Sequence, residues 1–175
     1  MIQLNQLRLR AFRADDLPFV FAGLSDPKVI QYYGISYQTE QQCEAQMLWY
    51  QRIASEGTGY WLAIESAQNQ QPLGALGLND ICRQHHQAAL GYWLLPQYWG
   101  RGMMKEALRG LLHFAFTQMK LHRIYAEVEL ENIASQQLLQ ALNFRMEGIS
   151  RDCEFKDPTF ISLMNYALLK HEFMH

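Results

Sequence analysis

Cysteine is scarce in this chain, and the three cysteines present form no pattern. Cys43, Cys82 and Cys153 are an odd number, lie far apart and include no C-x-x-C pair. This usage argues against a disulfide framework and is typical of a reducing compartment, so we expect three unpaired, buried thiols in a cytoplasmic protein. The six histidines show no ligand spacing either, and no metal site is expected.

The chain also lacks a charge excess and a long hydrophobic run. Fifteen Lys and Arg stand against 17 Asp and Glu, a formal net charge of −2, and no basic cluster occurs, which argues against a nucleic-acid partner. No apolar run approaches the roughly 18 residues that a membrane span needs. Residues 1–7 lack the basic flank and apolar core of a secretory signal. We therefore expect neither a nucleic acid nor a membrane as a partner.

The residues that are present predict one globular domain over residues 1–175. A hydrophobic content of 49% is enough for a sizeable core, and no repeat, linker or low-complexity tract interrupts the chain. Alternating apolar residues predict strands, and apolar residues at helical spacing predict helices. The expected strands are 6–12, 60–64, 73–78, 88–95, 123–130, 144–149 and 160–169; the expected helices are about 15–26, 39–57, 102–119 and 133–142.

This order predicts an α/β protein with a mixed sheet and flanking helices. Strands joined by short turns make antiparallel pairs, as over residues 60–78. The strand–helix–strand step over residues 88–130 predicts one parallel pair, because a crossover helix returns the chain in the same direction.

The turn between that strand and its helix, residues 97–104, is the most informative stretch of the sequence. A helix start leaves several backbone N–H groups without intrahelical partners, and the positive end of the helix dipole lies beside them. Gly100 and Gly102 would let an anion approach the main chain, and Arg101 adds a cation. The turn predicts a phosphate site, although an ordinary turn with two small residues explains the same letters.

Two blocks around this turn carry a resemblance to a known family. Gln97, Gly100 and Gly102 fill the fixed positions of the pattern Q/R-x-x-G-x-G/A, and a second block runs from Asn132 to Phe144. Together these blocks resemble the GNAT superfamily of N-acetyltransferases, and most of all its ribosomal-protein alanine and serine N-terminal acetyltransferases. The resemblance covers nearly the whole chain. It implies a GNAT-like fold with a mostly antiparallel sheet, in which acetyl-CoA lies where two parallel strands splay apart.

The resemblance also implies which residues hold acetyl-CoA. The signature residue Gln97 belongs to this set, and the pyrophosphate would lie on the turn formed by Gly100, Arg101, Gly102, Met103 and Met104. The pantetheine arm would pair with main-chain groups around Trp93, Leu94 and Leu95. Asn132 would hydrogen-bond the pantetheine, although an N-cap role explains this asparagine as well.

Ser135 is the implied catalytic residue. Many superfamily members place a tyrosine acid seven residues after the asparagine, but here that position is Leu139. In members without the tyrosine, a serine at the place of Ser135 is proposed to assist the leaving thiolate. A hydroxyl is a weak acid, so it would act by hydrogen bonding more than by proton transfer. A small residue needed for close packing is the alternative reading.

The general base is missing from its commonest place, because Ala89 stands where the family often has a carboxylate. Asp80, Glu65 and Glu129 are candidate bases acting through water, although each is also explained as a surface or strand-edge acid. Deprotonation at pH 7 costs about 1.1 kcal/mol for an α-amine and about 4.6 kcal/mol for a lysine. The missing carboxylate therefore favours an N-terminal amine as the acceptor.

We thus expect direct transfer of an acetyl group from acetyl-CoA to a peptide N-terminus, such as that of a ribosomal protein. A small amine (a polyamine, an amino acid or an antibiotic) is the alternative acceptor. A non-catalytic acyl-CoA-binding module and a nucleotide-binding domain are alternatives of another class. The loop holding Tyr32, Tyr33 and Tyr37 is expected either to contact the acceptor or to form a packed flap. The sequence fits a monomer or a homodimer.

Overall fold

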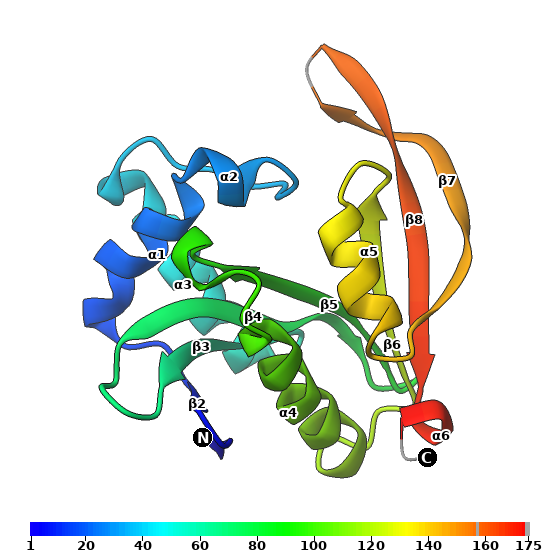
Figure 1. Cartoon of the computed structure of the whole chain (residues 1–175), viewed down its shortest axis with the longest axis horizontal. Coiled ribbons are helices and arrows are strands. Elements are labelled where there is room, and N and C mark those ends of the chain that lie inside the picture. Colours follow the sequence, from blue (N-terminus) through cyan, green and yellow to red (C-terminus); the bar gives the residue numbers. More distant parts are fainter. Residues whose placement is uncertain (157, 174–175) are drawn as a thin grey trace.

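The computed structural model describes residues 1–156 and 158–173. In this part of the chain, eight strands form one mixed sheet in the order β1-β2-β3-β4-β5-β6-β8-β7 (Figure 1). The strands are β1 (Ile2–Gln3), β2 (Leu7–Arg10), β3 (Tyr60–Ser66), β4 (Pro72–Cys82), β5 (Gln87–Leu94), β6 (Arg123–Glu129), β7 (Arg145–Lys156) and β8 (Thr159–Leu169). Neighbouring strands are antiparallel except β5 and β6, which are parallel. The predicted fold class is confirmed.

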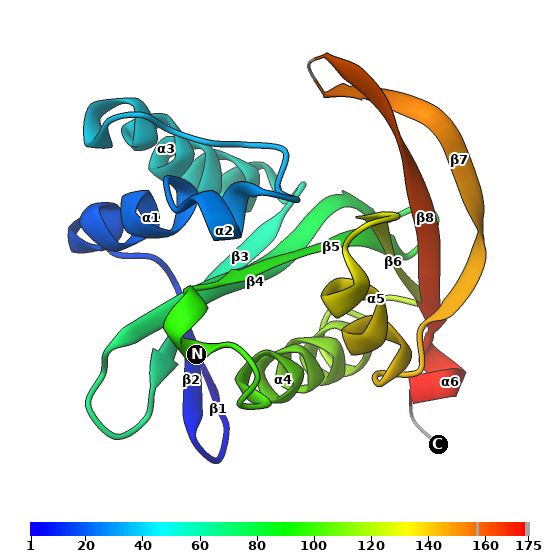
Figure 2. The ribbon, with the colours of Figure 1, turned by 45° about the horizontal axis from the view of Figure 1, so that its top comes forward.

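The helices cover both faces of this sheet (Figure 2). They are α1 (Leu17–Leu24), α2 (Pro27–Ile30), α3 (Glu40–Glu56), α4 (Met103–Thr117), α5 (Ile133–Gln140) and α6 (Lys170–Phe173), with 3-10 turns at Ala14–Asp16 and Pro96–Tyr98. One face packs against α4 and α5 around Leu76, Leu108 and Ile124. The other face carries Trp61 and Trp93, which pack against α1 and α3.

Local sequence signals explain where the long helices begin and end. Thr39 caps α3 by accepting a hydrogen bond from the Gln42 backbone N–H at 3.2 Å, and Gly57 ends the helix in the left-handed conformation. The apolar stripe of α4 is buried as its helical spacing predicts. The Asp26-Pro27 pair does more than end α1, because Asp26 caps the short helix α2 that follows.

The structure differs from the sequence-based prediction in several elements, including the short helices α2 and α6, and in the burial of the thiols. The short strand β1 was not predicted, and both β7 and β8 extend further toward their shared turn. The prediction of three buried thiols was wrong: Cys43 is buried, Cys82 is half-buried and Cys153 is exposed. Cys153 lies on the edge strand β7, most of which is exposed.

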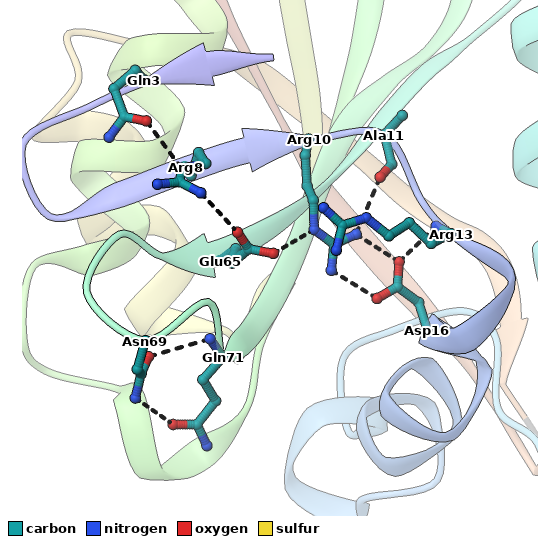
Figure 3. Close-up of polar contacts among 9 residues, drawn as sticks. All are labelled: Gln3, Arg8, Arg10, Ala11, Arg13, Asp16, Glu65, Asn69 and Gln71. Carbon is teal, nitrogen blue, oxygen red and sulfur yellow. Dashed lines mark hydrogen bonds and ion pairs between the residues drawn. The ribbon is translucent and has the colours of Figure 1, made fainter.

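A buried ion-pair network fixes α1 to the sheet (Figure 3). The Arg10 guanidinium on β2 contacts the Asp16 carboxylate at 2.7 and 2.8 Å and also donates to Glu65 on β3. Arg8 pairs with the same Glu65 carboxylate. The two carboxylates, Asp16 and Glu65, balance the charges of Arg8 and Arg10 within this network.

No helix in residues 1–156 and 158–173 has the length and apolarity to cross a membrane.

Candidate functional site

The parallel strands β5 and β6 pair over only three residues each and then separate. Their register joins Gln87, Ala88 and Ala89 to residues 123–125, yet β5 continues to Leu94 and β6 to Glu129. Figure 1 shows the two halves of the sheet diverging from this point. We call the space between the separated ends of β5 and β6 the interstrand gap. Along its edges, main-chain groups have no strand of the described chain beside them.

The register of β5 shows which main-chain groups face the gap. The Leu95 amide donates to the Leu73 carbonyl oxygen across the pair with β4, at 2.9 Å. Hydrogen-bonding direction alternates along a strand, so Trp93 also faces β4, whereas Leu94 and Tyr92 face the gap. The Leu94 carbonyl oxygen already accepts a 2.6 Å hydrogen bond from Trp99 Nε1. Of the three residues predicted to pair with pantetheine, Leu94 therefore offers its amide.

The α4 turn places unpaired donors beside the end of β5. Gly100 and Gly102 have φ angles of 71° and 74°, a region that L side chains rarely adopt, and a Cβ at either position would meet no protein atom within 4 Å. The Glu106 amide donates to the Gly102 carbonyl oxygen, so the amides that precede it in α4 have no intrahelical acceptor. The outer side of this turn is open, as a bound diphosphate would require.

The side chains of the turn divide between solvent and core. Gln97 and Arg101 are exposed, so both can reach a ligand at the turn. Met104 is buried and Met103 half-buried against the α4 core, so only their main-chain amides face outward as donors.

On the other side of the gap, the start of α5 brings three residues of interest together. Asn132 Oδ1 accepts a 3.1 Å hydrogen bond from the Ser135 amide, which is an N-cap and leaves the Asn132 NH₂ group as a donor. Ser135 Oγ lies 2.6 Å from the Tyr92 hydroxyl on β5. This hydrogen bond spans the gap from strand to helix. Burial raises the pKa of Tyr92 to about 12, and the hydrogen bond to Ser135 offsets part of that rise.

The opposite face of β6 carries carboxylates. Ile124, Ala126 and Val128 pack toward α4 and α5, so Tyr125, Glu127 and Glu129 point to the face of α1 and α3. Glu127 is exposed, two residues beyond the point where Ala89 pairs with Tyr125. Burial raises the pKa of Tyr125, with further contributions from the charges of Asp80 and Glu127. Asn79, Ala89 and Tyr125 are aligned across β4, β5 and β6, so Asp80 is next to this row of residues and Glu127 is two residues beyond it.

The structure removes two of the three candidate bases named from the sequence. Glu65 is 1% exposed and held in the Arg10 network, so it is neither a surface acid nor accessible to a substrate. Glu129 accepts a 2.6 Å hydrogen bond from Lys156 Nζ, which compensates its charge. Asp80 adopts a positive φ of 50° at an irregularity of β4, beside the pair of Asn79 with Ala89.

The tyrosine-containing loop lies next to the tip of the β7–β8 hairpin. Lys156 Nζ donates to the Gln31 carbonyl oxygen at 2.5 Å and lies 5.7 Å from the Tyr32 ring centre. Tyr37 donates to Gln46 of α3 at 2.9 Å, and Tyr33 packs on the core beneath α1 and α3. Tyr33 and Tyr37 thus form a packed flap, whereas Tyr32 faces the hairpin.

Three residues of the site were missed from the sequence: Tyr92, Trp99 and Glu127. The alternation of β6 predicts that Glu127 faces away from α4 and α5, so the sequence carried a signal for this residue. Tyr92 and Trp99 gave no such signal, because their contacts depend on how far β5 and β6 separate. No three His, Cys, Asp or Glu side chains in the described ranges gather as a metal site.

Comparison with known proteins agrees with this geometry. Residues 6–145 match the acetyltransferase (GNAT) domain family. The chain is 32% identical over 170 residues to the uncharacterized N-acetyltransferase p20 of Bacillus licheniformis, covering 97% of this chain and 96% of that protein.

Two solved structures confirm the fold. One is spermidine N-acetyltransferase from Vibrio cholerae in complex with CoA and spermine, with a TM-score of 0.87 and 23% identity, covering 97% of this chain and 99% of the other. The second is the ribosomal L7/L12 alpha-N-protein acetyltransferase RimL in complex with coenzyme A, with a TM-score of 0.87 and 19% identity, covering 96% and 97%. The family match and the identity to p20 lead to one conclusion: the chain belongs to the GNAT family and is an acetyl-CoA-dependent N-acetyltransferase.

Proposed function

We propose that the chain acetylates the N-terminal α-amine of a protein, such as a ribosomal protein, by direct transfer from acetyl-CoA. The whole chain acts as one catalytic domain. The coenzyme diphosphate lies on the α4 turn (Gln97 and residues 100–104), the pantetheine follows β5 at Leu94, and the NH₂ group of Asn132 donates to it. The unpaired thiols fit the reducing cytoplasm as the place of action.

The observation that carries the choice of acceptor is the compensated carboxylate of Glu129. A polyamine carries several positive charges and is best held by several uncompensated carboxylates. Here Lys156 already occupies Glu129 and also bonds the Gln31 carbonyl oxygen at the same place. This arrangement supports an acceptor with one amine, which an N-terminus provides. The protein then acts on its acceptor either as a monomer or as a homodimer.

Glu127 is the base that the proposal assigns. Its carboxylate is exposed on the face away from α4 and α5, so an amine entering on that face can pass its proton to it through a water molecule. An α-amine, with a pKa near 7.8, requires only modest help at pH 7. We infer direct transfer because, among the described residues, the side chain bonded to Ser135 Oγ is Tyr92 and not a histidine that could make this hydroxyl an acetyl-accepting nucleophile.

A small amine is the second candidate acceptor, and the exposed carboxylates of Asp80 on β4 and Glu127 on β6 favour it, since Asn79, Ala89 and Tyr125 are aligned across these strands. Two exposed carboxylates on nearby strands suit a diamine. The relatives of known structure include one enzyme named for spermidine and one named for a ribosomal protein, so both classes of acceptor occur on this fold.

The experiment is an acceptor screen in which coenzyme A release is followed by thiol detection. The acceptors are ribosomal-protein N-terminal peptides, the same peptides with a blocked N-terminus, spermidine and an aminoglycoside. We expect release with the free peptides and none with the blocked ones. Release with spermidine alone would move the assignment to a small amine, and acetyl-CoA binding without release from any acceptor would contradict an enzymatic role.

A further inference from the structure

The hydrogen bond between Tyr92 and Ser135 crosses the interstrand gap at the place where the acetyl group must react. Tyr92 projects from β5 beyond its last pairing with β6, toward the face covered by α4 and α5. Ser135 comes from the first turn of α5, which follows β6. A 2.6 Å distance between two hydroxyl oxygens is a short hydrogen bond. One hydrogen bond between these two side chains therefore connects the two edges of the gap.

Chemistry decides the direction of this hydrogen bond. A phenol is a much stronger acid than an aliphatic hydroxyl, so Tyr92 is the better donor and Ser135 Oγ the better acceptor. Within the described part of the chain, Tyr92 is the side chain bonded to Ser135 Oγ. Because Ser135 Oγ accepts a hydrogen bond from Tyr92, the Ser135 hydroxyl hydrogen remains available to a third group. A hydroxyl that accepts one hydrogen bond is polarised and donates a second one more strongly.

We propose that Tyr92 is a positioning residue for acetyl transfer: it donates to Ser135 Oγ and thereby directs the Ser135 hydrogen to the sulfur of the leaving coenzyme A thiolate. The inference rests on the proposed placement of acetyl-CoA in the gap. It also accounts for a tyrosine at position 92 in a chain whose α5 has Leu139 in the place of the tyrosine acid common in the family.

In the acetyl transfer, neither the Ser135 nor the Tyr92 hydroxyl gains or loses a proton. The amine nitrogen forms a bond to the thioester carbonyl carbon, and the carbon–sulfur bond breaks with its electron pair on sulfur. The amine proton leaves through water, and water later protonates the thiolate. Ser135 and Tyr92 donate hydrogen bonds only. The pKa of Tyr92, about 12, lies well above the value near 8.5 of an ordinary thiol, so the phenol keeps its proton.

The test uses the full-length enzyme with Tyr92→Phe, Ser135→Ala and the double variant. Tyr60→Phe is the matched control, because Tyr60 stacks on Phe114 away from the gap. Loss of one hydrogen bond to a developing anion lowers kcat about tenfold, with the KM for acetyl-CoA changed less than about twofold. Because both residues act through one hydrogen bond, the double variant falls about tenfold and not a hundredfold. Unchanged kcat in Tyr92→Phe overturns the proposal.

A second readout needs no acceptor. The thiol of coenzyme A bound to the enzyme is titrated by its thiolate absorbance, and we expect a lower pKa in the wild type than in Tyr92→Phe. A ring-fluorinated tyrosine at position 92 keeps the hydroxyl and the fold while strengthening the donor, and it should lower that thiol pKa further. Equal thiol pKa values in all three proteins overturn the inference. A wild type that shows the thiol shift but acetylates no amine contradicts the proposed function alone.

Discussion

At the scale of single residues, the site depends on which carboxylates are free. Glu65 and Glu129 both have cationic partners, whereas Glu127 is exposed beside the separation point of β5 and β6. A carboxylate without a cationic partner can accept the amine proton through a water molecule. A carboxylate in an ion pair is stabilised in its charged form and is therefore a weaker base.

Glu127→Gln tests this assignment. The amide keeps the size of the side chain but cannot accept the amine proton, so we expect kcat/KM for the acceptor to fall about a hundredfold. The loss should shrink at high pH, where the α-amine loses its proton unaided. Steady-state kinetics from pH 6 to about pH 9.5 measures both effects. Glu44→Gln, on the exposed side of α3, is the control; an equal loss in both variants would remove Glu127 from the mechanism.

Asp16 gives a stability prediction at the same scale. Burial alone would raise its pKa, but the hydrogen bonds from Arg10 and the Arg13 amide outweigh burial and lower it. A lowered folded-state pKa stabilises the protein above the unfolded pKa and loses that contribution as the pH falls through the folded value.

We therefore expect Asp16→Asn to lower the free energy of unfolding by about 3 kcal/mol at pH 7, because Arg10 loses a buried partner. The difference from the wild type should narrow below about pH 4. Urea unfolding at both pH values measures it. Asp15→Asn is the control, since the neighbouring Asp15 is exposed. If the difference in free energy of unfolding between the wild type and Asp16→Asn did not change with pH, the negative charge of Asp16 would not be the source of the stabilisation.

At the scale of elements, the α4 turn and the β7–β8 hairpin define the two ends of the site. The turn presents amides without an intrahelical acceptor beside the end of β5, and the hairpin reaches the loop before α3 through Lys156. Each element can be tested without touching the reacting groups.

Gly102→Ala tests the turn. At a φ of 74° a Cβ costs about 1–2 kcal/mol, so the turn relaxes and its amides move away from the coenzyme. We expect the Kd for acetyl-CoA to rise about tenfold, measured by calorimetry. Gly148→Ala, on β7 where a Cβ meets open space, should bind normally. Wild-type affinity in Gly102→Ala would place the diphosphate elsewhere.

Lys156→Met tests the hairpin. It removes the contacts to Gln31 and Glu129 and leaves Glu129 without compensation. An exposed ion pair contributes little, so we expect kcat/KM for spermidine relative to an N-terminal peptide to rise about threefold. The KM for acetyl-CoA should not change. Lys28→Met, exposed on α2, is the control. A ratio equal to that of the control would mean that Glu129 does not contact the acceptor.

At the scale of the whole molecule, the sequence predicted what depends on local pattern. The buried apolar stripe of α4 follows from residues close in the chain. The full length of β7 and β8 could not be predicted from local pattern. Most of the hairpin is exposed, so its residues do not alternate between apolar and polar as those of a half-buried strand do. Glu65 was misread as a surface acid because its partners, Arg8 and Arg10, come from another strand.

The site divides in the same way. The Gly100–Gly102 turn can be recognised in the sequence because the residues that form it are consecutive in the chain. The contact of Tyr92 with Ser135 joins residues 43 positions apart and depends on the separation of two strands, which no local pattern encodes.

A crystal structure of the protein with acetyl-CoA would show directly whether the coenzyme lies in the interstrand gap. We expect the diphosphate within hydrogen-bond distance of the first α4 amides, the pantetheine beside Leu94, and the sulfur atom beside Ser135 in the gap between β5 and β6. A coenzyme bound outside that gap, or a gap filled by side chains in the complex, would contradict this expectation.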